Sequence, residues 1–236
     1  MGIVSLRRFS LPLIVMFIIS IAPSAWAVDK AVADRWANQL ATTSAMLKVK
    51  SYQSALPILR KLTVEMMGQL GPSDETTYVL VVPLIQIALA EEGLGDHAAA
   101  MWHWDMAQTL YPKAAESDLS MFGDPGVVLK QNILVDPNPS ECPKPRVNET
   151  KPTVLKHVPP QYPDGARRFR ARGIVIMWLK IRPDGSAAEP RVVKPLPAPL
   201  TYAALEAARM WKFKPAERDG KPVESNFCLT INYKLN

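Results

Sequence analysis

The sequence has few of the side chains that bring chemistry to an active site. Its 236 residues include two cysteines, Cys142 and Cys228, and three histidines, His97, His103 and His157. The cysteines are too far apart for a CxxC redox motif, and no histidine stands in a metal-ligand spacing. Nucleophile motifs and phosphate-binding loops are also absent. We therefore expect no enzyme, no cofactor and no bound metal, and we interpret His97 and His103 as surface or packed helix residues.

The sequence also lacks an apolar run long enough to cross a membrane. Residues 11–22 form an apolar run of 12 residues, whereas a spanning helix needs about 20. Arg7 and Arg8 precede this run, and Ala25 and Ala27 follow it with A-x-A spacing, which is typical of a secretory signal peptide. We expect residues 1–27 to be cleaved and the mature chain to lie in the periplasm. The alternative is an uncleaved inner-membrane anchor that faces the periplasm.

Charge is distributed unevenly along the chain. Residues 28–151 carry 11 Lys and Arg against 15 Asp and Glu, whereas residues 152–236 carry 15 against 7. A basic domain after an acidic region indicates acidic or anionic partners for the C-terminal part, or attraction between the two halves. No groove-binding motif accompanies the positive charge, so we expect no nucleic-acid partner.

Residues 28–134 are predicted to form a helical domain. Apolar residues recur at helical spacing in residues 54–70, 77–92 and 97–111, and Gly and Pro separate these runs. In the third run, Ala100, Trp104 and Ala107 share one helical face.

The spacing of small, large and turn residues in this region carries a resemblance. The relevant positions in residues 88–112 are Ala88, Gly93, Gly95, Asp96, Ala100, Trp104, Ala107 and Pro112. With this spacing, residues 88–112 resemble the second half of a tetratricopeptide repeat, and residues 50–74 resemble an earlier copy. The resemblance implies stacked helical hairpins, and a plain helical hairpin bundle is the alternative.

A proline-rich linker follows. Eight prolines occur between residues 137 and 163, and proline both removes backbone donors and interrupts helices. Residues 135–158 are therefore predicted to be an extended linker.

Residues 159–236 are predicted to form a domain of strands and helices. The pattern indicates a short helix in 162–172, strands in 174–181 and 191–194, a helix in 200–210 and a strand in 223–235. Pro183, Asp184 and Gly185 form a turn between the first two strands. Helices on one face of a small antiparallel sheet give an α+β, two-layer domain.

Several short pieces of sequence occur in order along this domain: Pro160-Gln161-Tyr162-Pro163 with Ala166; Gly173-Ile174-Val175; Pro183-Asp184-Gly185; Val192-Val193; Leu205, Ala208 and residues 211–216; and the final strand. These pieces and the order of elements resemble the C-terminal domain of the TonB family over residues 152–236. The resemblance implies a periplasmic domain that binds an outer-membrane transporter peptide by adding it as a strand to the edge of its sheet. In this way it would support energy-dependent transmembrane transport.

The resemblance also implies which residues form the peptide-binding edge. Gln161 stands where the family has a glutamine that contacts the peptide, although a solvated linker residue is the alternative. The other expected edge residues are Tyr162, Ser225, Asn226, Phe227, Leu229, Ile231 and Tyr233.

The family pattern is incomplete in this chain. The leader resembles a cleavable signal, and a long Pro, Glu and Lys-rich rod is missing. Two further partners are therefore considered, an inner-membrane motor protein and a second copy of the chain. The alternative function is a structural or scaffolding envelope protein that binds proteins through its helical domain and dimerises through its TonB-like domain.

The two cysteines are expected to pair, because thiols of an exported chain meet an oxidising compartment; two free thiols are the alternative. Cys228 lies on the polar face of the last strand, and Cys142 lies in the linker. A disulfide would hold the linker across the open side of the sheet. The strand at 174–181 is apolar on both faces, so the linker, the helical domain or a second copy must cover its outer face.

Overall fold

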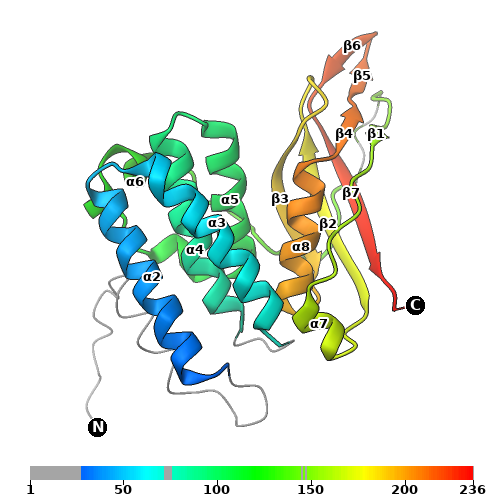
Figure 1. The fold of residues 1–236 in the computed structure, drawn as a ribbon. Coiled ribbons are helices and arrows are strands. Elements are labelled where there is room, and N and C mark those ends of the chain that lie inside the picture. Colours follow the sequence, from blue (N-terminus) through cyan, green and yellow to red (C-terminus); the bar gives the residue numbers. More distant parts are fainter. Residues whose placement is uncertain (1–27, 72–75, 145, 147, 236) are drawn as a thin grey trace, which may run out of the picture.

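The computed structural model describes residues 28–71, 76–144, 146 and 148–235, and the expected signal peptide at residues 1–27 lies outside them. Figure 1 shows a helical region beside a group of strands, with helix α8 between the two. The order of elements confirms the predicted α+β class, with helices first and a small antiparallel sheet at the C-terminal end.

In the residues that the structure describes, the helical region has four long helices and several short ones. The long helices are α2 (Lys30–Lys48), α3 (Tyr52–Gln69), α4 (Thr76–Gly93) and α5 (His97–Leu110), and they are followed by two 3₁₀ turns (Pro112–Glu116 and Ser120–Phe122) and α6 (Asp124–Gln131). The predicted helices at 54–70, 77–92 and 97–111 therefore agree with α3, α4 and α5 to within two residues at each end.

Helix α4 is the centre of this region. It is apolar on every side, and its residues 79–91 are all buried because α2, α3, α5, α6 and α8 pack around it. Its buried Gln86 is satisfied by donating from Nε2 to the Leu40 carbonyl at 3.1 Å and by accepting from the Thr43 hydroxyl at 2.5 Å. At the end of α4, Gly93 lies against the Tyr52 ring, which leaves no room for a Cβ atom.

The C-terminal domain is built on a three-stranded antiparallel sheet of order β3-β2-β7. Its strands are β2 (Gly173–Ile181), β3 (Ala187–Lys194) and β7 (Ser225–Tyr233). Helix α8 (Ala198–Arg209) covers one face, where its Leu200, Ala204 and Leu205 pack with alternate β2 residues. The short helix α7 (Asp164–Arg168) lies at one end of α8 (Figure 1).

Four short strands complete the domain, and the sequence pattern did not predict them. β1 (Thr153–Lys156) pairs with β4 (Lys212–Lys214), so part of the expected linker joins the strands. β5 (Ala216–Arg218) and β6 (Lys221–Val223) form a hairpin at the far tip. Gly185, in the predicted turn, has φ +78° and accepts a hydrogen bond from the Phe213 amide at 3.0 Å, a close approach that a Cβ atom would prevent.

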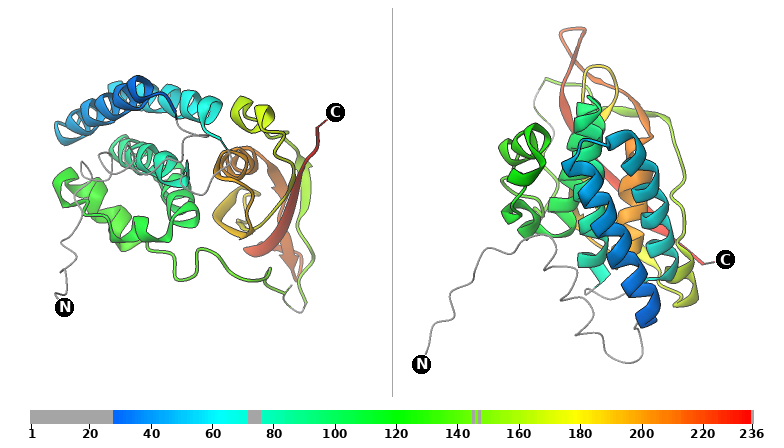
Figure 2. Two further views of the ribbon diagram at one scale, coloured as in Figure 1. Left: turned by 90° about the horizontal axis from the view of Figure 1, so that it is seen from below. Right: turned by 60° about the vertical axis from the view of Figure 1, so that its left-hand side comes forward.

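The two regions pack directly on each other. Helix α5 lies against β3, and α4 and α5 lie against α8. The Arg168 guanidinium of α7 donates to the carbonyls of Gly68 and Gln69 at the end of α3, at 3.0 and 3.4 Å. Cys142 and Cys228 form the expected disulfide, with a Cα–Cα distance of 5.9 Å. Figure 2 shows the linker passing along the outside of the molecule between the two regions.

Candidate functional site

Strand β7 is the open edge of the sheet. It pairs with β2 along its whole length, from Ser225 opposite Ile181 to Tyr233 opposite Gly173. On its other side, no backbone hydrogen bond joins β7 to any residue that the structure describes. This edge therefore offers a row of unpaired N–H and C=O groups to an incoming strand.

A slot of about 360 Å³ lies beside the C-terminal half of β7, and we call it the edge slot. Residues 230–234 form one wall, and the opposite wall is formed by His157, Pro159, Pro160, Tyr162 and Trp211. Because Pro159 and Pro160 carry no N–H group, the segment opposite β7 is poorly suited to pair with it as a strand.

Aromatic contacts and hydrogen bonds hold the edge slot in shape. The Trp211 indole donates to the Val158 carbonyl at 2.8 Å, and the His157 ring meets its edge with centroids 4.5 Å apart. The rings of Tyr162 and Tyr233 meet edge to face at 5.5 Å. The Tyr162 hydroxyl donates to the Ala171 carbonyl. The walls are thus formed before any ligand enters.

Tyr233 anchors the end of β7 to the core. Its hydroxyl donates to the Leu200 carbonyl of α8 at 2.9 Å. Burial, with a smaller contribution from Tyr162, raises the pKa of Tyr233 well above its usual value, so the hydroxyl stays a neutral donor.

The structure distributes the sequence-predicted edge residues over three environments. Leu229, Ile231 and Tyr233 point into the core, and Ser225 is buried at the start of the strand. Asn226 and Phe227 are half-buried, and Phe227 packs against Phe213. Gln161 is exposed and lies outside the slot lining, whereas its neighbour Tyr162 lines the slot.

Since these apolar side chains face inward, the backbone of β7 is the part of the strand that a partner would meet. Sequence reasoning missed the exposed Thr230 and Asn232 and the opposite wall, His157 and Trp211. The alternation in residues 223–235 already placed Thr230 and Asn232 on the polar face. No sequence signal joined them to Trp211.

The opposite edge of the sheet, β3, is closed. A bulge at Glu189, where φ is +44°, interrupts its pairing with β2. Next to it, Pro190 has no N–H group to donate, and its carbonyl accepts from the Thr109 hydroxyl of α5 at 3.0 Å. The Val192 carbonyl accepts from the side-chain amide of Asn138 at 3.4 Å. Helix α5 and the linker therefore occupy this edge, and β7 is the edge that remains.

The outer face of the sheet is crossed by the linker. Cys228 lies opposite Trp178 in the β2–β7 pairing, so the disulfide holds the linker beside this tryptophan. The Arg191 guanidinium lies 4.8 Å from the Trp178 ring centroid. The linker thus reaches the outer face of β2, for which the sequence pattern required a covering segment. On this face Ile174, Ile176 and Trp178 are half-buried.

Comparison with known proteins matches this region of the chain. The family described as Gram-negative bacterial TonB protein C-terminal matches residues 158–235. These residues are therefore similar to a TonB C-terminal domain, and we call them the TonB domain. They contain α7, α8, the whole three-stranded sheet and nearly all of the edge slot; the helical region lies outside the match.

Relatives of the TonB domain match over a similar length. The chain is 32% identical over 79 residues to the protein TonB of Xanthomonas campestris pv. campestris, which covers 33% of this chain and 35% of that protein. It is 31% identical over 87 residues to the protein TonB of Vibrio cholerae, which covers 36% of each. The chain thus spans about a third of the length of these curated relatives.

A solved structure is also similar, the solution NMR structure of the Pseudomonas aeruginosa TonB CTD. It is 25% identical in sequence, has a TM-score of 0.31, and covers 38% of this chain and 91% of that chain.

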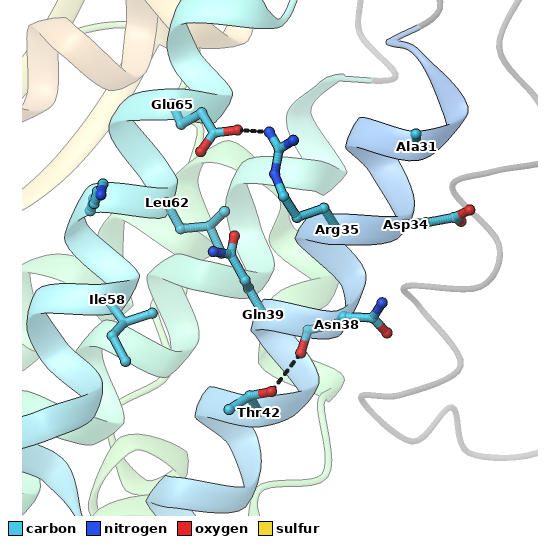
Figure 3. Close-up of a pocket in the computed structure, with 10 residues that line it drawn as sticks. Ala31, Asp34, Arg35, Asn38, Gln39, Thr42, Ile58, Leu62 and Glu65 are labelled. Carbon is cyan, nitrogen blue, oxygen red and sulfur yellow. Dashed lines mark hydrogen bonds and ion pairs between the residues drawn. The ribbon is translucent and has the colours of Figure 1, made fainter.

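A second cavity lies outside the TonB domain, between α2 and α3. This groove of about 820 Å³ is shown in Figure 3, where the Arg35 guanidinium reaches across to Glu65. Asn38, Gln39 and Thr42 line the α2 side, while Ile58 and Leu62 line the α3 side.

The described part of the chain holds no group of three or more His, Cys, Asp or Glu side chains that could bind a metal ion. Among the helices of those same residues, none is long and apolar enough to cross a membrane.

Proposed function

We propose that this chain is a periplasmic TonB-like protein that binds outer-membrane transporters by strand addition and so supports energy-dependent transmembrane transport. One observation carries the proposal: the outer edge of β7 is unpaired in the described residues and lies beside a preformed slot, while the β3 edge is closed. The match of residues 158–235 to the TonB C-terminal family supports the same partner.

The edge slot has the properties that a bound extended peptide requires. The free backbone of β7 supplies donors and acceptors at alternate residues, which provides affinity without dependence on the peptide's side chains. Trp211, Tyr162 and the two prolines offer apolar contact on the other side. Gln161 is exposed directly before Tyr162, and in this proposal its side-chain amide bonds the peptide backbone.

Domain roles follow from the same proposal. Residues 1–27 would direct export, or alternatively anchor the chain in the inner membrane. Residues 28–134 would form a helical, tetratricopeptide-like domain, with residues 135–158 as the linker to the TonB-like domain at 159–236.

The Cys142–Cys228 disulfide supports a periplasmic location, because disulfides persist in oxidising compartments. A proton-driven motor protein of the inner membrane is a further possible partner.

Peptides with selective backbone methylation test strand addition without altering the protein. Synthetic peptides from transporter N-terminal segments are titrated into the mature protein and binding is measured by calorimetry. In a strand added to one edge, alternate N–H groups face that edge. Methylating the amides of one parity should abolish binding, while methylating those of the other parity should leave it nearly unchanged.

Two results would count against the proposal. If no unmethylated transporter peptide binds, the chain lacks the proposed partner. If both methylated sets bind like the unmethylated peptide, binding does not use the edge of β7.

The groove between α2 and α3 favours a second candidate function, a scaffolding envelope protein that binds other proteins through its helical region. In that case, the TonB-like domain would serve dimerisation. Substituting Asn38 and Lys61, which line the groove, should then abolish capture of the partner without affecting peptide binding at β7. Light scattering of the mature protein would reveal a dimer, and a monomer would contradict the dimerisation role.

A further inference from the structure

The β3 edge is closed by parts of the chain that lie outside the TonB domain, so something must hold them there. Thr109 of α5 and Asn138 of the linker provide the hydrogen bonds to β3. These two hydrogen bonds add to the packing of α5 on β3 and to the Cys142–Cys228 disulfide, which fixes the linker just beyond Asn138. A charged contact between the regions lies next to this edge, where α5 meets α8.

His103 of α5 is the centre of that contact. It is 2% exposed, and both of its ring nitrogens face carboxylates. Nδ1 lies 2.5 Å from Glu91 of α4, in the helical region, and Nε2 lies 3.1 Å from Glu206 of α8, in the TonB domain. Each ring nitrogen has a carboxylate at ion-pair distance, and only the doubly protonated ring is positively charged, so the geometry fits a buried imidazolium between two carboxylates.

Two arginines flank this cluster, so its two carboxylates have three cationic neighbours when the histidine is charged. Arg60 of α3 donates to the other oxygen of Glu91 at 2.9 Å, and Arg209 of α8 lies 3.6 Å from Glu206. Glu91 is 1% exposed, so it depends on Arg60 and His103 for compensation. Removing one member leaves a buried charge without its partner, which makes the cluster act as a unit.

We propose that His103, Glu91 and Glu206 form an electrostatic latch that seats α5 and the linker over the β3 edge. The helical region then covers the β3 edge of the sheet. Partner strands can pair with the β7 edge but not with the β3 edge. This role is independent of peptide binding at β7.

Hydrogen exchange detects the latch directly. Glu206 is the residue to change first, because its side chain is 25% exposed and its loss does not open the interior of the helical region. In Glu206→Gln, amide exchange in residues 187–194 should rise by about tenfold or more, equivalent to the loss of roughly 1.4 kcal/mol of local protection. Exchange in residues 174–180 of β2, beneath α8, should stay at the wild-type rate.

His103→Gln and a matched control complete the experiment. His103→Gln should open the same segment, and the double variant should open it no further than the more severe single variant, because both changes break one unit. Glu217→Gln removes the same charge from the TonB domain at β5, where Glu217 pairs with Lys214 at 3.3 Å, and should leave 187–194 protected.

The latch proposal is contradicted if amide exchange in residues 187–194 is as slow in Glu206→Gln and His103→Gln as it is in Glu217→Gln. It is equally overturned if exchange rises in 174–180 and 187–194 together, because the cluster then supports the whole domain and does not hold a local cap.

Discussion

At the scale of single residues, the disulfide between Cys142 and Cys228 has the clearest effect on stability. It joins the linker to the middle of β7 across a sequence separation of 86 residues. Because a cross-link of this span restricts the unfolded chain strongly, Cys142→Ser should lower the free energy of unfolding by about 3 to 5 kcal/mol. Guanidinium unfolding of the variant measures this. The wild type in reductant should match it, and an unchanged unfolding midpoint would contradict the prediction.

A substitution at Tyr233 should change the stability of the domain without changing its affinity for a peptide. In Tyr233→Phe, the Leu200 carbonyl loses its side-chain donor, and the free energy of unfolding should fall by about 1 to 2 kcal/mol. The ring contact with Tyr162 and the backbone of β7 remain, so peptide affinity should stay within about twofold. Calorimetry and chemical unfolding of one preparation test both parts, and a large loss of affinity would assign the hydroxyl to the site.

At the scale of elements, the two edges of the sheet differ in how they avoid unwanted pairing. β3 combines a bulge, a proline and side-chain caps. Pro190→Val with Asn138→Ala restores an N–H donor and frees the Val192 carbonyl. This pair of changes should promote self-association, seen as a concentration-dependent rise in mass by light scattering.

Pro222→Val is the matched control for that experiment. Pro222 lies on β6 in the exposed hairpin, opposite Glu217, and its substitution also restores a strand N–H. Because it leaves the β3 edge closed, this variant should remain at the mass of the wild type. Equal self-association in both variants would show that β3 needs no special closure.

Periodicity predicted the elements that are long enough to repeat it. The three predicted helices each span at least two helical turns, and the strand at β2 has at least four alternations of side chains between its two faces. Each of these elements matches the structure closely. β1, β4, β5 and β6 have three or four residues each, so they carry no readable period and exist because a partner segment is nearby. The predicted helix at 162–172 ends early, at Arg168, where the chain turns through Arg170 with φ +52°.

The candidate site was predictable on one wall only. The alternation in residues 223–235 and the resemblance to the TonB family indicated β7 and Tyr162. His157 and Trp211 lie 54 residues apart in sequence and meet only after folding, so nothing in the local pattern joins them. His103 was interpreted as a surface or packed residue. Its role depends on Glu91 and Glu206, which come from two other helices.

At the scale of the whole molecule, the latch makes stability depend on pH. Burial lowers the pKa of His103, but its interactions with Glu206 and Glu91 outweigh burial and raise it to about 9. The contribution of the charged His103 to the free energy of unfolding is therefore complete below pH 6.5, the usual pKa of histidine. This contribution is lost as the pH rises to about 9. Asp105, whose pKa burial raises to about 8, acts in the same direction between about pH 4 and pH 8.

We expect the melting temperature to fall between pH 6.5 and 9, with a loss in unfolding free energy of roughly 1 to 3 kcal/mol. Thermal melts across this range measure the slope. His103→Gln should flatten most of it, and Asp105→Asn should leave the His103 part in place. A wild-type melting temperature that rises over this interval would show that the histidine is not held as an imidazolium.

The sulfur bridge also defines how the protein bears mechanical load. A pulling force applied between the helical region and the C-terminal end of β7 is transmitted along the backbone to Cys142, across the disulfide to Cys228, and from there along the rest of β7. Covalent bonds carry this tension, so residues 143–227 cannot be drawn out while the bridge is intact. All of β2, β3 and α8 thus lies inside a mechanically shielded loop, and a force on a bound partner strand would extend only the part of β7 that follows Cys228.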